Sequence, residues 1–262
     1  MDTQFAKRHP HRAGIHRHHQ QRNRPTDAQK NQLKPWLKKC WCIPPNQNAP
    51  FVAAMEDVLD VYARQPDPKR PLVCLDEGCT QLLEHVREPE PMQPTTQEQV
   101  GHELREDNAY VRGGMCSFFV TFAPLLSHRH LTVTGHRTAL DFAGVVRELV
   151  DTTYPDADKI VVVMDNLNTH TVASLYQAFA PAEAKRLADK LEIHYTPKHG
   201  SWLNMAEIEL SVLARECLSR RIADEATLTS EIGAWERARN AAKMTVHWQF
   251  KTADARTLVS GN

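Results

Sequence analysis

The 262-residue sequence lacks a net charge, a long apolar run and a complete zinc motif. Lysine plus arginine and aspartate plus glutamate are equal at 32 each, so the whole chain is neither basic nor acidic. No apolar run approaches the roughly 20 residues that a membrane-spanning helix needs. The polar N-terminus also lacks the apolar segment of a signal peptide. We therefore expect a cytoplasmic protein with no membrane partner.

The cysteine spacing excludes the common structural zinc sites, which need two closely spaced ligand pairs. The cysteines are Cys40, Cys42, Cys74, Cys79, Cys116 and Cys217. In the cytoplasm cysteines stay reduced, so we predict packed, free thiols.

Charge is unevenly distributed along the chain. Residues 1–40 hold ten Lys and Arg against two Asp, whereas the other 222 residues hold 22 basic and 30 acidic side chains. Residues 1–31 contain five His and few large apolar side chains, so we expect a disordered, basic, His-rich tail. A basic arm on an acidic body is typical of nucleic-acid-binding proteins, although a solvated tail also explains it.

Two short apolar runs each end in an acidic residue. Residues 160–164 (IVVVM) precede Asp165, and residues 71–75 (PLVCL) precede Asp76. Such runs are typical of fully buried strands. Because active sites of α/β proteins gather at the carboxyl edge of the sheet, both acids are candidate site residues.

The remaining patterns predict an α/β protein. Helices are expected over 49–64 with Asn48 as the cap, from Thr138 with Asp141 completing a capping box, over 171–191 with a break at Pro181, over 205–220, and around Trp235. Further strands are expected over 115–123, 129–133 and 191–195, and a polar loop over 80–109.

This order is a three-stranded antiparallel meander followed by alternating β and α elements. It predicts a ribonuclease-H-like mixed sheet flanked by helices. The predicted divisions are a tail (1–31), a helical lead-in and linker (32–70), a catalytic domain (71–225) and a C-terminal helical extension (226–262).

The fold would bring a third acid to Asp76 and Asp165. The segment 206–209 offers Glu207 and Glu209, which lie about 200° apart on a helix and cannot both take part. Small neighbours favour Glu207, while Glu209 is predicted to face solvent. Two carboxylates about 4 Å apart repel by about 4 kcal/mol at an effective dielectric near 20, so such a cluster needs a proton or a cation. Oxygen ligands favour Mg²⁺ or Mn²⁺.

Eight stretches between residues 33 and 256 carry a resemblance to a known family. They are LKPWLKK (33–39), WCIPP (41–45), FVAAMEDVLDVY (51–62), PLVCLDE (71–77), RTALDFA (137–143), VVVMDNLNTH (161–170), HYTPKHGSWLNMAEIELS (194–211) and WQFKTADAR (248–256). In them the chain resembles the DDE transposases of bacterial insertion sequences related to the Tc/mariner superfamily.

The resemblance implies that Asp76, Asp165 and Glu207 are the catalytic, metal-binding triad, which holds two Mg²⁺ or Mn²⁺ ions. It implies DNA cleavage and strand transfer on transposon ends and target DNA, by a homodimer on DNA associated with the bacterial nucleoid. Polar residues in the same motifs are candidates for DNA contact or for ordering the site. They are Asn166, His170, His199 and Asn204.

Two departures from the family pattern stand out. The family's N-terminal helix-turn-helix modules find no counterpart before Leu33, which suggests a truncated copy. Gly78 replaces the Thr or Ser that usually follows the Asp-Glu pair, which removes a hydroxyl beside Asp76. The alternatives are a non-catalytic remnant that binds DNA through the basic arm and a folded product without function.

Overall fold

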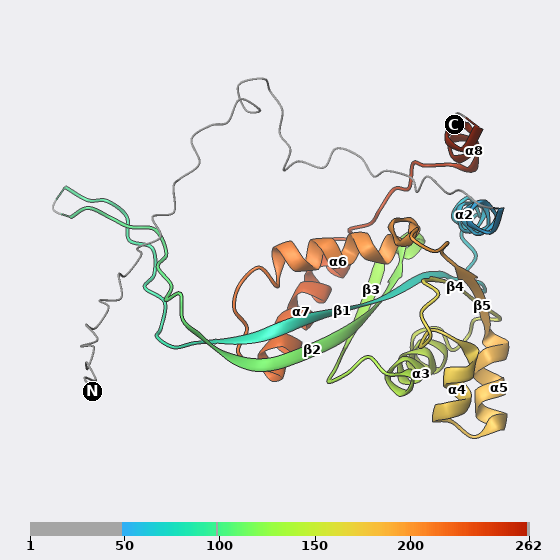
Figure 1. Cartoon of the computed structure of the whole chain (residues 1–262), viewed down its shortest axis with the longest axis horizontal. Helices are drawn as coiled ribbons and strands as arrows, with labels where there is room; N and C mark the ends of the chain where they lie inside the picture. Colours follow the sequence, from blue (N-terminus) through green and yellow to red (C-terminus); the bar gives the residue numbers. More distant parts are fainter. Residues whose placement is uncertain (1–48, 98, 261–262) are drawn as a thin grey trace, which may run out of the picture. The chain divides into compact units, whose positions relative to one another are not determined.

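A computed structural model describes residues 49–97 and 99–260, and within that part the centre is a five-stranded sheet (Figure 1). The strand order is β3-β2-β1-β4-β5; β1, β2 and β3 are antiparallel, while β4 and β5 run parallel to β1. The strands are β1 (Leu72–His85), β2 (Tyr110–Ala123), β3 (His128–Thr134), β4 (Ile160–Met164) and β5 (Leu191–Tyr195). This mixed sheet confirms the predicted ribonuclease-H-like arrangement.

Helices cover both faces of the sheet (Figure 1). On one face, α3, α4 and α5 enclose the main apolar core with side chains of the sheet such as Val73, Leu75 and Val162. On the other face, α6 packs on β1 and β2, and α7 packs on β3. The helices are α2 (Ala49–Tyr62), α3 (Ala139–Glu148), α4 (Val172–Ala178), α5 (Pro181–Lys190), α6 (Met205–Glu216), α7 (Glu225–Ala241) and α8 (Thr252–Ser260). Three single turns complete the elements: η1 (Pro124–Leu126), η2 (Leu149–Thr153) and η3 (Ser201–Leu203).

Capping residues and a proline predicted several helix boundaries correctly. The Thr138 hydroxyl accepts from the Asp141 amide at 3.3 Å, and the Thr138 amide donates to the Asp141 carboxylate at 2.7 Å, so the capping box is present. The predicted break at Pro181 separates α4 from α5. The capping role of Asn48 and the His-rich tail lie outside the described residues.

The predicted loop over 80–109 begins too early, and the second strand starts five residues before its predicted start at 115. β1 continues to His85, and β2 begins at Tyr110, because the two strands pair along almost their whole length. Asp76 therefore lies inside a long strand instead of at its end. The described parts of the connection, 86–97 and 99–109, carry two isolated bridges, Glu90 with Arg105 and Gln93 with His102, and extend away from the sheet (Figure 1).

The cysteine prediction is right for three of the four described residues. Cys74, Cys116 and Cys217 are buried and free, whereas Cys79 is free but exposed. Cys79 lies two residues beyond Glu77 in the extended part of β1. Cys40 and Cys42 lie outside the described residues.

Candidate active site

The pairing register brings Asp76 and Asp165 side by side. In the parallel pair of β1 and β4, Cys74 is the partner of Val163. Two residues further along, Asp76 comes level with Asp165, which follows the last residue of β4. Neighbouring strands lie about 4.8 Å apart. The buried run of β4 thus delivers Asp165 to the edge of the sheet next to the middle of β1.

Asn204 connects this edge to α6. Its side-chain oxygen accepts from the Ala206 amide at 3.1 Å and caps the helix, while its Nδ2 donates to the Leu75 carbonyl at 2.9 Å and to the Asp76 carboxylate at 3.3 Å. Asn204 is fully buried. One amide therefore contacts both the start of α6 and the carboxylate of Asp76. The predicted site-ordering role of Asn204 stays a prediction.

Glu207 lies in the first turn of α6 and is half-buried. The carboxylate of Glu207 lies close enough to Asp76 to affect its pKa. Burial raises the pKa of Asp76 most, and the carboxylates of Glu207, Glu77 and Asp165 raise it further, to about 8. The hydrogen bond from the Glu77 amide acts in the opposite direction and lowers it. The three predicted acids thus converge closely enough to act on one another's charge. Such a crowded oxygen-only donor set suits a hard divalent cation.

His170 holds Asp165 from the opposite side. Its Nδ1 lies 2.5 Å from Oδ1 of Asp165, and its Nε2 lies 2.9 Å from Oε2 of Glu77, with the second contact bent away from hydrogen-bond geometry. Burial lowers the pKa of His170, but the two carboxylates outweigh it and raise the pKa to about 9. Ligand atoms of Glu77, Asp165 and His170 lie within 4.8 Å of one another.

Glu77 was missed at the sequence level. It follows Asp76 directly, and the acidic pair after a buried run was visible in the sequence. Its side chain is only 5% exposed, and besides His170 it faces Arg137, whose guanidinium lies 3.8 Å away. No local pattern indicates that its partner is a histidine more than ninety residues further along the chain.

The prediction that Glu209 faces solvent is wrong. Its carboxylate is 1% exposed and lies 2.9 Å from the fully buried guanidinium of Arg129 and 3.2 Å from that of Arg239. These partners come from β3 and α7. Glu209 is therefore a structural ion-pairing residue, while Glu207 on the other side of the helix faces Asp76.

Asn166 and His199 are not drawn into the cluster. Both side chains are exposed, and the structure records no hydrogen bond or ion pair from either of them within its described part. His199 has a φ of 65°, a left-handed conformation in the turn before η3. Their predicted roles toward DNA or metal stay predictions.

Gly78 is explained by packing. A Cβ at this position would lie 2.5 and 2.7 Å from two ring carbons of Phe118, its cross-strand partner on β2. Phe118 is buried, so its ring has little room to move. A Thr or Ser cannot be accommodated at residue 78 unless Phe118 shifts.

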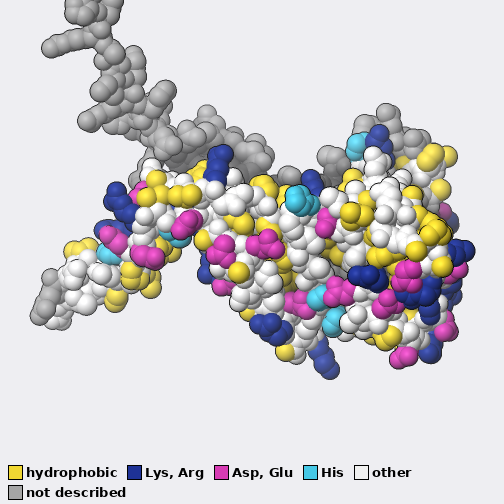
Figure 2. Space-filling view, turned by 90° about the horizontal axis from the view of Figure 1, so that it is seen from below, with side chains coloured by type: hydrophobic (Ala, Val, Ile, Leu, Met, Phe, Trp, Pro, Cys, Tyr) yellow, Lys and Arg dark blue, Asp and Glu magenta, His cyan; other side chains and the backbone are white. Residues whose placement is uncertain are grey.

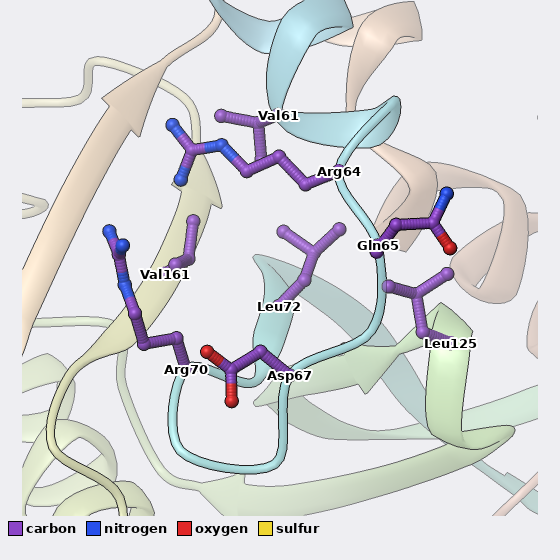
Figure 3. Close-up of a pocket in the computed structure, with 8 residues that line it drawn as sticks. All are labelled: Val61, Arg64, Gln65, Asp67, Arg70, Leu72, Leu125 and Val161. Atoms are coloured by element: carbon purple, nitrogen blue, oxygen red, sulfur yellow. The ribbon is translucent and has the colours of Figure 1, made fainter.

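A cavity of about 130 Å³ lies at the other end of β1 and β4 (Figure 3). Arg64 and Arg70 line it, and both pair with Glu192. Leu72 and Val161, a register pair in the same lining, precede Asp76 and Asp165 by four residues, which is about 13 Å of strand. The cavity is therefore separate from the carboxylate cluster.

Lys and Arg side chains lie among Asp and Glu over the face shown in Figure 2. Among the helices that the structure describes, none combines the length and hydropathy needed to span a bilayer.

Comparison with solved structures identifies similar folds. The chain is 16% identical to the "Mos1 mariner paired end complex with Mn", with a TM-score of 0.50, over 81% of this chain and 63% of that one. The "Mos1 transposase paired-end complex with left transposon end" matches at 13% identity and a TM-score of 0.49, over 80% and 65% of the two chains. The chain thus spans less than two thirds of these Mos1 chains. The first match supports the fold assignment alone.

The family model supplies the classification. Comparison with curated proteins returned no match. The model of the DDE superfamily endonucleases matches residues 71–229, which is more than half of the chain and contains Asp76, Asp165 and Glu207. The sheet, the register that aligns two acids, and the third acid on α6 all lie inside the matched segment. This chain belongs to the DDE superfamily endonucleases.

Proposed function

We propose that this chain is the catalytic domain of a transposase of Tc/mariner type, which cleaves DNA at transposon ends and joins them to target DNA. The observation that carries the proposal is the convergence of three carboxylates from β1, the end of β4 and the first turn of α6, with a pKa of about 8 at Asp76. The catalytic domain covers residues 71–225, with 226–262 as its helical extension.

The donor set fits divalent cations. Asp76 receives hydrogen bonds only from amides, those of Glu77 and Asn204, and these leave its negative charge without a cationic partner among the described residues. Asp76, Asp165 and Glu207 would hold two Mg²⁺ or Mn²⁺ ions. When bound, such ions activate an attacking oxygen and stabilise the leaving oxygen of a phosphodiester. Mos1 structures titled as complexes with Mn and with Mg support this choice of metals.

The protein residues hold the carboxylates still for two successive displacements. In the first, a water oxygen bonds to phosphorus, the bond from phosphorus to the 3′-oxygen breaks, and a 3′-hydroxyl and a 5′-phosphate are left. In the second, that 3′-hydroxyl bonds to a target phosphorus and displaces another 3′-oxygen. Asn204 keeps Asp76 in place, and His170 does the same for Asp165. We propose that the enzyme acts as a homodimer on DNA, in keeping with the paired-end titles of the Mos1 structures.

A plasmid-nicking assay with Mg²⁺ or Mn²⁺ tests the proposal. The wild-type chain should nick supercoiled plasmid only with metal, and Asp165→Ala should reduce nicking to background. Asp158→Ala is the matched control, because this exposed acid lies two residues before β4 and has no recorded side-chain partner among the described residues. It should leave nicking unchanged.

Two outcomes would refute the proposal. Nicking that survives Asp165→Ala would place the chemistry elsewhere or assign it to a contaminant. A wild-type chain that binds DNA in a salt-dependent way but never cleaves it would support the alternative, a non-catalytic DNA-binding remnant.

A further inference from the structure

Asp76 and Glu77 are neighbours in sequence but point to opposite faces of the sheet, because side chains alternate along a strand. Asp76 faces α6, where Asn204 and Glu207 lie. Glu77 faces α3 and approaches His170. A nearly buried carboxylate that is directed away from the proposed triad needs an explanation, because burying a charge is unfavourable unless it is paired.

His170 is fixed from every side. Its ring packs on Phe142 of α3 with centroids 5.0 Å apart. Its amide donates to the Leu167 carbonyl at 2.9 Å, and its carbonyl accepts from the Tyr195 hydroxyl at 2.9 Å. The side chain is fully buried. The ring therefore cannot turn without disturbing the loop that follows β4.

The ring connects two carboxylates. Nδ1 lies 2.5 Å from Oδ1 of Asp165, and Nε2 lies 2.9 Å from Oε2 of Glu77. Both ring nitrogens thus face a carboxylate oxygen, which leaves neither one free to bind a cation. Although the three residues have the spacing of a metal site, this geometry is that of a carboxylate–histidine–carboxylate bridge.

We propose that Glu77 is a positioning residue that acts through His170 on Asp165. Glu77 holds the imidazole in the orientation in which Nδ1 meets Oδ1 of Asp165. Among the described contacts the other oxygen of Asp165 stays free for a cation. This inference rests on the proposed function, since it gives Asp165 the role of a metal ligand. Partners of this kind typically change metal affinity 10–100-fold when they are removed.

Manganese binding to the full chain, measured by electron paramagnetic resonance, tests the inference without relying on activity. Glu77→Gln should raise the Kd for Mn²⁺ at least about tenfold, because a neutral amide cannot form the ion pair with His170. Glu84→Gln is the matched control: this exposed acid lies on the same strand, and its substitution should leave the Kd unchanged. Glu77→Asp keeps the charge but withdraws the carboxylate from His170, so it should weaken binding as well and serves if Glu77→Gln does not fold.

A double-mutant cycle with His170→Asn separates positioning from direct ligation. If Glu77 acts through His170, adding Glu77→Gln to His170→Asn should change the Kd less than about twofold. A further full loss in that background would show that Glu77 acts directly and would overturn the inference. A wild-type Kd in both Glu77 variants would overturn it too, while the triad proposal would stand. Failure of Asp165→Ala to weaken Mn²⁺ binding would instead refute the triad.

Discussion

The two acids on α6 offer the sharpest test of the structure, because their substitutions should have opposite consequences. Glu209→Ala removes a buried carboxylate and leaves the guanidinium groups of Arg129 and Arg239 without it. At 2.9 Å and an effective dielectric near 20, the attraction between Glu209 and Arg129 is about 6 kcal/mol. Desolvation offsets part of this, and breaking one side of a buried pair usually costs about 3–5 kcal/mol.

A loss of that size is a large share of the roughly 5–15 kcal/mol by which domains are stable. The melting temperature should therefore fall by about 6–20 °C. In urea, Glu209→Ala should unfold at a lower midpoint concentration than the wild-type protein, with the same dependence of the unfolding free energy on urea. Glu207→Ala removes a half-buried side chain with no recorded hydrogen bond in the described part of the chain, so it should leave the melting temperature within a few degrees while abolishing plasmid nicking.

The opposite pattern would refute the reasoning. If Glu209→Ala kept its melting temperature but lost cleavage, the burial of Glu209 and the choice between the two acids would both be wrong. Glu209→Gln keeps the shape of the side chain while removing its charge. It should still destabilise the protein, because the buried Arg129 and the partly buried Arg239 would face a neutral amide.

Two further predictions concern the face of β1 toward α6. Gly78→Thr should lower the free energy of unfolding by about 1–3 kcal/mol through overlap with the Phe118 ring, and the loss should be smaller in a Phe118→Leu background, as chemical denaturation of the four proteins would show. The second concerns pH. Because the pKa of Asp76 is raised in the fold to about 8, the folded state retains a proton that the unfolded state loses near pH 3.8. Asp76 therefore contributes stability at low pH that is lost as pH rises toward 8. The metal-free melting temperature should fall across this window, less steeply in Asp76→Asn, and an equal slope in both proteins would contradict the assignment.

Sequence patterns predicted the elements whose signals are local. The run over 160–164 is buried on both sides, so its apolar character alone predicted β4. It also predicted that Asp165 follows the end of that strand. The capping box at Thr138 and the break at Pro181 depend on residues within one helical turn, and both are confirmed. Each of these features is determined by neighbours in the chain, which is why periodicity and capping chemistry were sufficient.

The errors share one physical cause, the identity of a distant partner. β1 extends past Asp76 because β2 pairs with it. The polar stretch over 80–85 has no local pattern that predicts this pairing. Glu209 is buried because Arg129 and Arg239 neutralise it, although a helical acid without such partners faces water. The helical spacing shows that Glu207 and Glu209 lie on different sides of α6. It cannot show which side faces an arginine.

The acids around the cluster differ in whether a cationic partner neutralises them. Asp165 and Glu77 share His170, and Glu209 pairs with two arginines. Asp76 and Glu207 have no cationic partner among the described residues, although burial and mutual repulsion raise the pKa of Asp76 to about 8. A fold that neutralises its other buried acids but leaves these two uncompensated on one face is destabilised there unless a proton or a cation binds. We propose Asp165, which lies level with Asp76, as the third ligand of that cation, with His170 and Glu77 holding its carboxylate in place.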